Sequence, residues 1–196
     1  MFKKIRSLLV LTVLLLTACK EKPKTGDTHF ISVPSLIEKQ VAHVDTSLYA
    51  IVQYVSTDTL PADTSYIPRE KFREIAREFL DLPDLSDPAI ASRFREENRY
   101  DSLIRKVIIS YLPLDPKKEE IKKMELLVSA EMLEDSSNKV TNIIVEKAVN
   151  NRDGFKGQKM LWKTGKSFLI ITSTQQPGEA EKTSTNRVTW NEDQTP

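Results

Sequence analysis

The chain has 196 residues, with 29 lysines and arginines against 28 aspartates and glutamates, and a formal net charge of +1. This balance gives no electrostatic support for nucleic-acid binding, and five glycines and ten prolines exclude a collagen-like chain. With one cysteine the chain has no intrachain disulfide, so hydrophobic burial must hold the fold, which a chain of this length allows.

Residues 1–18 have the layout of a secretory signal peptide. Three basic residues within the first six precede an apolar run over residues 8–16, and small residues then lead to Cys19. The run is too short for a stable transmembrane helix. Removal of this segment takes away three positive charges and gives the remaining 178 residues a formal charge of −2.

The sequence Leu-Thr-Ala-Cys at residues 16–19 resembles the lipobox of bacterial lipoproteins. The resemblance implies that Cys19 carries a diacylglycerol, that the chain is cut before Cys19, and that the new amine takes a third acyl chain. Two or more acyl chains hold a protein firmly to a bilayer, so the implied partner is a membrane. Because Lys20 rather than an aspartate follows, the resemblance implies an outer-membrane address. Orientations toward the periplasm and toward the outside both stay open.

The remaining chain is predicted to form one domain on a short tether. Residues 19–30 are the expected lipidated cysteine and tether. Within them, the polar stretch from Lys20 to Thr28 contains Pro23 and Gly26, and its nine or so residues span roughly 17 Å when flexible, from about 5–6 Å × √n. Residues 31–190 form the expected domain, and residues 191–196 are expected to fray.

Two amphipathic helices are predicted. Residues 34–44 carry an apolar stripe at helical spacing, and either a capping box from Ser35 to Glu38 or Pro34 marks the start of this helix. The second helix lies between Pro68 and Pro83. Its expected buried face consists of Phe72, Ile75, Ala76, Phe79 and Leu80.

The rest of the domain is predicted to consist of strands and loops. Residues 89–97 are either one helical turn or extended chain, and Thr164 with Gly165 predicts a hairpin turn. Strands are expected at residues 48–55, 103–112, 124–128, 140–147, 159–162 and 167–174, with short additions near Tyr66 and at residues 187–190. The resulting fold class is α+β, with two amphipathic helices packed on an antiparallel meander sheet of four to six strands.

Several fragments resemble catalytic motifs but lack the required spacing. Gly165-Lys166-Ser167 resembles the end of a phosphate-binding loop, yet Met160 stands where the pattern needs a glycine. Ser136 to Lys139 and Lys163 to Gly165 resemble pieces of penicillin-recognising serine enzymes without the expected context. The two histidines, His29 and His43, share no predicted face, so no metal site and no cofactor is expected.

One charged cluster is the candidate for carboxylate chemistry. Glu96, Glu97 and Asp101 alternate with Arg95, Arg99 and Tyr100, and a carboxylate among them can in principle act as a general base. The preferred interpretation is a solvated, ion-paired surface. Trp162 and Trp190 are expected to be partly buried packing residues, with a glycan platform as the alternative.

Two short triplets resemble the acceptor of O-glycosylation on bacterial envelope proteins. They are Asp-Thr-Leu around Thr59 and Asp-Ser-Leu around Ser102. Thr59 is the better candidate because it lies in a predicted exposed loop.

The function that these observations favour is a non-catalytic binding or scaffolding module, anchored to the membrane through Cys19. Its expected partner is an envelope protein or a glycan, not a nucleic acid. The alternatives are an envelope hydrolase that uses carboxylates and a carrier of a small lipid or sugar.

Overall fold

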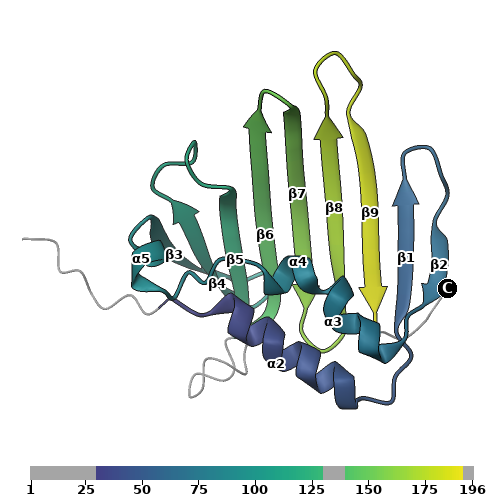
Figure 1. The fold of residues 1–196 in the computed structure, drawn as a ribbon. Helices are drawn as coiled ribbons and strands as arrows, with labels where there is room; N and C mark the ends of the chain where they lie inside the picture. The colour runs from purple at the N-terminus through teal and green to yellow at the C-terminus, as the bar shows by residue number, and fades with distance from the viewer. Residues whose placement is uncertain (1–29, 130–139, 192–196) are drawn as a thin grey trace, which may run out of the picture.

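The computed structural model describes residues 30–129 and 140–191. Its strands are β1 (Val52–Thr57), β2 (Asp63–Tyr66), β3 (Phe94–Asp101), β4 (Lys106–Pro113), β5 (Ile121–Ser129), β6 (Val140–Asn151), β7 (Gly154–Lys163), β8 (Ser167–Gln175) and β9 (Lys182–Thr189). They form one antiparallel sheet of nine strands in the order β2-β1-β9-β8-β7-β6-β5-β4-β3 (Figure 1). From β3 to β9 each strand pairs with the next, while β1 and β2 extend the sheet beyond β9.

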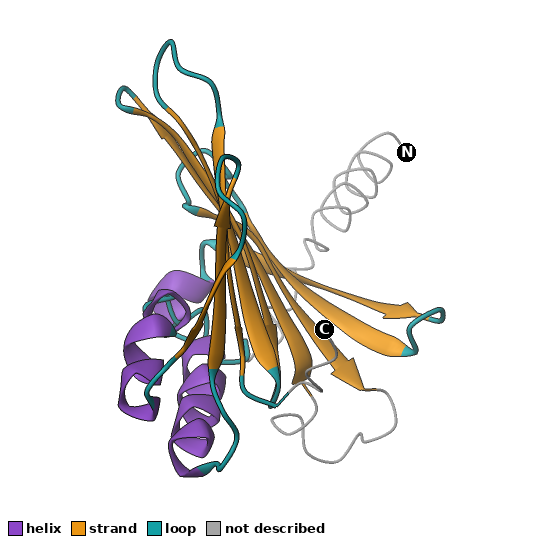
Figure 2. Cartoon of the chain, turned by 90° about the vertical axis from the view of Figure 1, so that its right-hand side faces the viewer, coloured by secondary structure: helices purple, strands orange, loops and turns teal. Residues whose placement is uncertain are grey.

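Helices cover one side of this sheet (Figure 2). The longest described helix is α2 (Val33–Thr46), and its buried residues are Val33, Ile37, Val41 and Val44. The N-cap is Ser32, whose side chain accepts a hydrogen bond from the Ser35 backbone N–H, with proline in the first turn. The helix therefore begins one residue before the predicted range. Of the two predicted start signals, Pro34 in the first turn is confirmed, and the capping box from Ser35 to Glu38 is wrong.

The second predicted helix is broken. A 3-10 turn, η2 (Arg69–Lys71), leads into α3 (Phe72–Ile75) and α4 (Arg77–Leu80), and α5 (Pro88–Ala91) follows after a loop. Ala76 separates α3 from α4 with φ −79° and ψ 0°. Phe72 and Phe79 are nevertheless fully buried, because both turns direct their aromatic side chains toward the sheet.

An aromatic cluster joins the helices to the sheet. Phe79 lies 5.1 Å from Trp162 and 5.4 Å from Phe168 between ring centroids, and Phe72 lies 5.0 Å from Trp190. Trp162 stacks on Phe168 at 5.4 Å. Both tryptophans are buried, more completely than the sequence predicted, so neither is an exposed glycan platform.

The predicted hairpin turn at Thr164 and Gly165 is confirmed. Gly165 has φ +71°, the left-handed conformation that glycine adopts without strain, and it connects β7 to β8. Its N–H donates a hydrogen bond of 2.8 Å to Oε1 of Gln40, a residue of α2. The turn therefore also fixes the helix against the end of the sheet.

The predicted fold class is wrong. The described residues form a predominantly β structure, with nine strands in place of the expected four to six and only short helices besides α2. Three strands were missed or shortened because they lack alternating apolar residues: β2, β3 and β9 are rich in threonine, serine, asparagine or charged residues. Sequence periodicity detects a strand through its buried face, and these strands have little of one.

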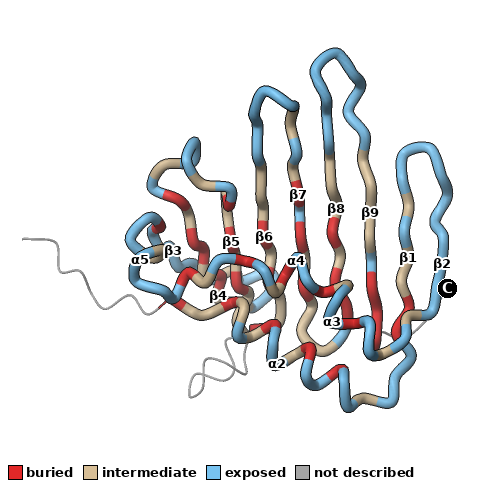
Figure 3. Tube along the Cα trace, viewed as in Figure 1, coloured by how far each residue is buried: buried red, intermediate tan, exposed pale blue. Residues whose placement is uncertain are grey.

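The helices cover only part of the sheet. Buried residues lie near the helices, and the far ends of the strands are exposed (Figure 3). On the helix side of the sheet, the row of Trp162, Phe168 and Val188 is buried, whereas Lys156, Thr174 and Lys182 farther along the same strands are exposed. The strands therefore project beyond the helical layer as a single sheet in contact with water.

Candidate functional site

The face of the sheet that points away from the helices, here called the open face, is not covered by any described helix (Figure 2). Its centre is a cross-strand row of Ile144, Leu161 and Leu169 on β6, β7 and β8. Leu127 and Ile171 lie on the same face. All five side chains are half-buried by their neighbours within the sheet, so they offer apolar surface to a partner.

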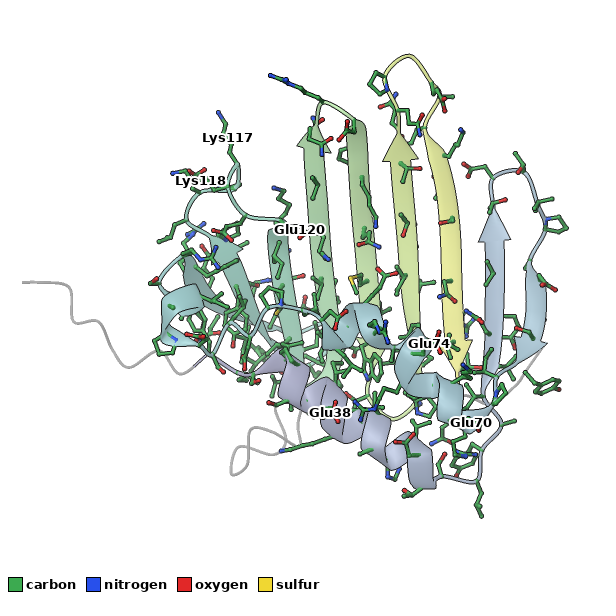
Figure 4. The ribbon with its side chains drawn as sticks, in the orientation of Figure 1. Glu38, Glu70, Glu74, Lys117, Lys118 and Glu120 are labelled. Carbon is green, nitrogen blue, oxygen red and sulfur yellow. The ribbon has the colours of Figure 1, made fainter. Side chains whose placement is uncertain are left out.

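Charges on the open face are mostly positive. Strand alternation places seven basic and four acidic residues on it: Arg95, Arg99, Lys106, Lys123, Lys159, Lys163, Arg187, and Glu97, Asp101, Glu125, Glu146. The helical layer, residues 33–46 and 69–91, has the reverse balance of eight acidic and five basic residues. Glu38, Glu70 and Glu74 lie in this layer (Figure 4). The two sides of the sheet therefore carry opposite net charge.

A hollow of about 410 Å³ lies on the open face over β3, β4 and β5. Its most shielded ionisable group is Glu125, whose side chain is 13% exposed and lies 2.8 Å from the Lys123 ammonium. The Ser110 hydroxyl also donates to the Glu125 carboxylate at 3.2 Å. The carboxylate is thus held between two donors, an arrangement that fixes its position.

A second hollow of about 280 Å³ lies over β6, β7 and β8, beside the Phe155 ring. The ring occupies the space above Gly157, where an added Cβ would lie 2.8 Å from the ring carbon Cζ. Ile171, Lys159 and Glu146 also line this hollow, which is more apolar than the first. Sequence reasoning missed Glu125, Lys159 and their neighbours, although strand alternation in β5 and β7 could have placed them on one face.

A third hollow of about 500 Å³ lies beside the loop between β4 and β5, from which Lys117, Lys118 and Glu120 project (Figure 4). Several of its charged groups are already paired within the molecule. Lys118 lies 3.2 Å from Asp115, and Lys147 lies 3.2 Å from Glu120. We therefore assign this hollow a structural role in holding the loop.

The structure does not bring the predicted carboxylate cluster together. Glu97 and Asp101 are on the open face, whereas Glu96 is on the helix side of β3. Arg95 pairs with Glu97, Arg99 lies 3.5 Å from Asp101, and Glu96 accepts a hydrogen bond of 2.7 Å from Asn98. Arg95, Glu97 and Arg99 are exposed, whereas Glu96 and Asp101 are half-buried. Two of the three carboxylates are ion-paired and the third accepts from an amide, which matches the interpretation as a surface network rather than a catalytic pair.

Other candidate residues also lie apart. His43 is exposed near the end of α2, while His29 lies outside the described residues. Residues 30–129 and 140–191 contain no group of three or more potential metal ligands. Residues 136–139, with their resemblance to serine enzymes, fall outside these ranges.

Both glycosylation triplets lie at the tips of hairpins. Thr59 is exposed in the turn between β1 and β2, where its hydroxyl lies 3.3 Å from that of Thr57. Ser102 is exposed in the turn between β3 and β4, where the Asp101 carboxylate accepts the backbone N–H of Leu103 at 3.0 Å. Both hydroxyls are accessible to a modifying enzyme.

The expected anchor at Cys19 and its tether fall outside the described residues. In the part of the chain that the structure describes, no helix has the length and apolar character needed to cross a membrane. No protein-family model matches the chain, and comparisons with curated proteins and with solved structures found no significant match.

Proposed function

We propose that the protein is a lipid-anchored binding module of the bacterial outer membrane, and that it receives an acidic envelope partner on its open face. The observation that carries this proposal is the uncovered row of Ile144, Leu161 and Leu169, bordered by an excess of basic side chains. Apolar residues provide contact area, and the surrounding positive charges select and steer an acidic surface.

The packing favours a binding surface over a carrier. A carrier needs an enclosed space, and the region between helices and sheet is filled by Phe72, Phe79, Trp162, Phe168 and Trp190. The hollows lie on the surface instead, where a protruding side chain of a partner can fit into them. A hydrolase that uses Glu96, Glu97 or Asp101 has no support from the geometry, because these carboxylates do not converge.

Site-specific photo-crosslinking tests the open face directly. We expect a photoreactive residue at Leu169 to crosslink the partner in intact envelopes. The matched control is the same residue at Ala42, which is exposed on α2 and should give no product. Crosslinking from Ala42 but not from Leu169 would move the binding surface to the helical layer and overturn the assignment.

The anchor is tested separately. We expect Cys19→Ser to abolish lipid labelling and to leave the chain unprocessed or soluble, because the proposed thiol acceptor is lost. Mass spectrometry of the N-terminal peptide, together with membrane fractionation, measures the result. Unchanged membrane association without acyl mass would refute the anchor.

Thr59 is the expected glycan acceptor, since its exposed hairpin turn is accessible. Thr59→Ala should remove a glycan mass from the intact protein, with Ser102→Ala as the control. An unmodified wild-type peptide over Thr59 in the native envelope would contradict this expectation.

A further inference from the structure

The strand β3 forms one outer edge of the sheet. Among the described residues it pairs on one side only, with β4. Leu114 donates its N–H to the carbonyl of Arg93 at 2.8 Å, so the backbone groups of Arg93 point toward β4. Along a strand these groups point alternately to the two sides. Every second residue after Arg93 therefore also bonds toward β4, namely Arg95, Glu97, Arg99 and Asp101. The backbone N–H and C=O groups of Glu96, Asn98 and Tyr100 therefore face outward, as an unfilled template for another strand.

We propose that this edge pairs with the same edge of a second copy of the chain. The two copies would be related by a two-fold axis that is perpendicular to the sheet and passes midway between their Asn98 residues, and their β3 strands would run antiparallel. Asn98 of each copy would then face Asn98 of the other, and Glu96 would face Tyr100. All of these are outward-facing positions, so the backbone groups match in both copies.

The charges on the open face match in this register. Arg95 of one copy lies opposite Asp101 of the second copy, and Glu97 lies opposite Arg99. Symmetry repeats both pairs, so four opposite-charge pairs form. They occupy the non-hydrogen-bonded positions, where facing side chains approach most closely.

Neighbouring registers are disfavoured by the same charges. A two-fold axis at Glu97 would place Glu97 against Glu97 and Arg95 against Arg99. An axis at Arg99 would place Arg99 against Arg99 and Glu97 against Asp101. Like charges that face each other across strands are destabilising. Among the registers centred on Glu97, Asn98 and Arg99, the charges of β3 therefore favour the one centred on Asn98.

Exposed apolar side chains extend this edge at both ends. Tyr100 is 58% exposed on β3, Leu103 is 93% exposed in the turn after it, and Leu114 is 61% exposed beside the start of β3. In the proposed register Leu103 of one copy reaches Arg93 of the second copy, whose neighbour across the sheet is Leu114. Pairing would bring these leucines toward each other and reduce their exposure.

The present ion pairs do not oppose the dimer. Arg95 and Glu97 pair within one strand, as do Arg99 and Asp101, and both arginines are more than half exposed. Such exposed pairs contribute little to stability, so an exchange of partners between copies has a small cost.

Charge reversal at Glu97 and Arg99 tests the proposed dimer, because each single reversal should weaken it and the two together should restore it. The chain from Lys20 to Pro196, which keeps every described residue, is studied by sedimentation equilibrium. We expect the wild type to dimerise. Glu97→Arg and Arg99→Glu, each alone, place like charges at two symmetric positions and should weaken dimerisation by at least about tenfold. Both changes in one chain restore opposite charges, and the double variant should dimerise again.

A mixture of the two single variants sharpens this test. Glu97→Arg in one copy and Arg99→Glu in the other again give opposite charges, so the mixture should form a heterodimer although neither variant dimerises alone. Because both side chains are exposed, urea unfolding should be nearly unchanged for all three chains. A wild type that stays monomeric at its highest soluble concentration, or a double variant as monomeric as the singles, would overturn the proposal.

A backbone variant separates strand pairing from charge. Asn98→Pro removes an N–H that faces outward and that makes no bond to β4, so the monomer should keep its fold while dimerisation is lost. Retention of the dimer by a folded Asn98→Pro chain would contradict strand pairing at this edge.

Discussion

Tyr111 connects the start of the domain to the sheet. Its ring lies 4.6 Å from that of Phe30, and its hydroxyl accepts the backbone N–H of Ile31 at 3.0 Å. Burial raises the pKa of Tyr111 to about 12, even though the hydrogen bond from Ile31 acts to lower it. The phenol is therefore neutral at physiological pH and fixes the point where the expected tether meets the fold.

This shift has a consequence for alkaline stability. A group with a raised pKa in the folded state contributes stability that is present below its unfolded pKa, near 10, and lost as the pH rises toward 12. We expect the free energy of unfolding of the wild type to fall across this interval. Tyr111→Phe should fall less steeply, as urea melts at each pH would show. Parallel pH profiles for the two chains would show that Tyr111 is not the titrating group.

Phe79 tests the aromatic cluster. It is fully buried and lies within 5.4 Å of both Trp162 and Phe168, between ring centroids. Phe79→Ala should lower the free energy of unfolding by ~3–5 kcal/mol, because it loses transfer energy and leaves a cavity. Urea denaturation measures the change. A loss below ~1 kcal/mol would mean that the helices do not pack on the sheet through this residue.

At the scale of elements, two glycines have contrasting surroundings. Gly154, the first residue of β7, has φ +133°, and an added Cβ would lie 2.3 Å from the backbone oxygen of Gln175. Gly178, in the turn between β8 and β9, has φ +81° and no atom within 4 Å of an added Cβ. The same substitution therefore has different costs at these two positions.

We expect Gly178→Ala to cost only the strain of a left-handed residue, ~1–2 kcal/mol. Gly154→Ala adds a clash with backbone that cannot rotate away, so it should cost more than Gly178→Ala. Thermal and urea unfolding of the two variants, measured side by side, give the comparison. Equal losses would mean that the hairpin between β6 and β7 relaxes without cost.

The elements predicted from the sequence were those with a buried face. The stripe from Val33 to Val44 predicted α2 to within a few residues, and Gly165 predicted its turn. Most of β3 and the first part of β9 were not predicted, because both faces of these strands are largely polar and sequence periodicity does not distinguish such a pattern from a loop. The sequence did not predict the break at Ala76, because α3 and α4 keep their apolar side chains on one face, as a continuous helix would.

The candidate surface was harder to predict than the elements. Glu125 lies far in sequence from Leu161 and Leu169, and the registers of β5, β6, β7 and β8 bring all three onto one face. The charged run from Arg95 to Asp101 was recognised as an ion-paired surface, but its position at an open edge depends on the order of all nine strands. Such an order is a property of the whole molecule and has no local signal.

The whole molecule is a sheet with a covered half and a bare half. Near the helices, Met160 and Ile170 are buried under the aromatic cluster, whereas Lys156 and Thr174 on the same two strands are exposed. Backbone hydrogen bonds in the bare half have water on both sides, and only neighbouring strands protect them. Stability should therefore decrease along each strand with distance from the helices.

Native-state hydrogen exchange would measure this gradient. We expect the amides of Met160 and Ile170 to exchange only through global unfolding, and those of Lys156 and Thr174 to exchange orders of magnitude faster through local opening. Phe79→Ala should accelerate exchange at the first pair by lowering global stability, and it should leave the second pair nearly unchanged. Uniform protection along β7 and β8 would contradict the expectation and would mean that the projecting strands open only together with the core.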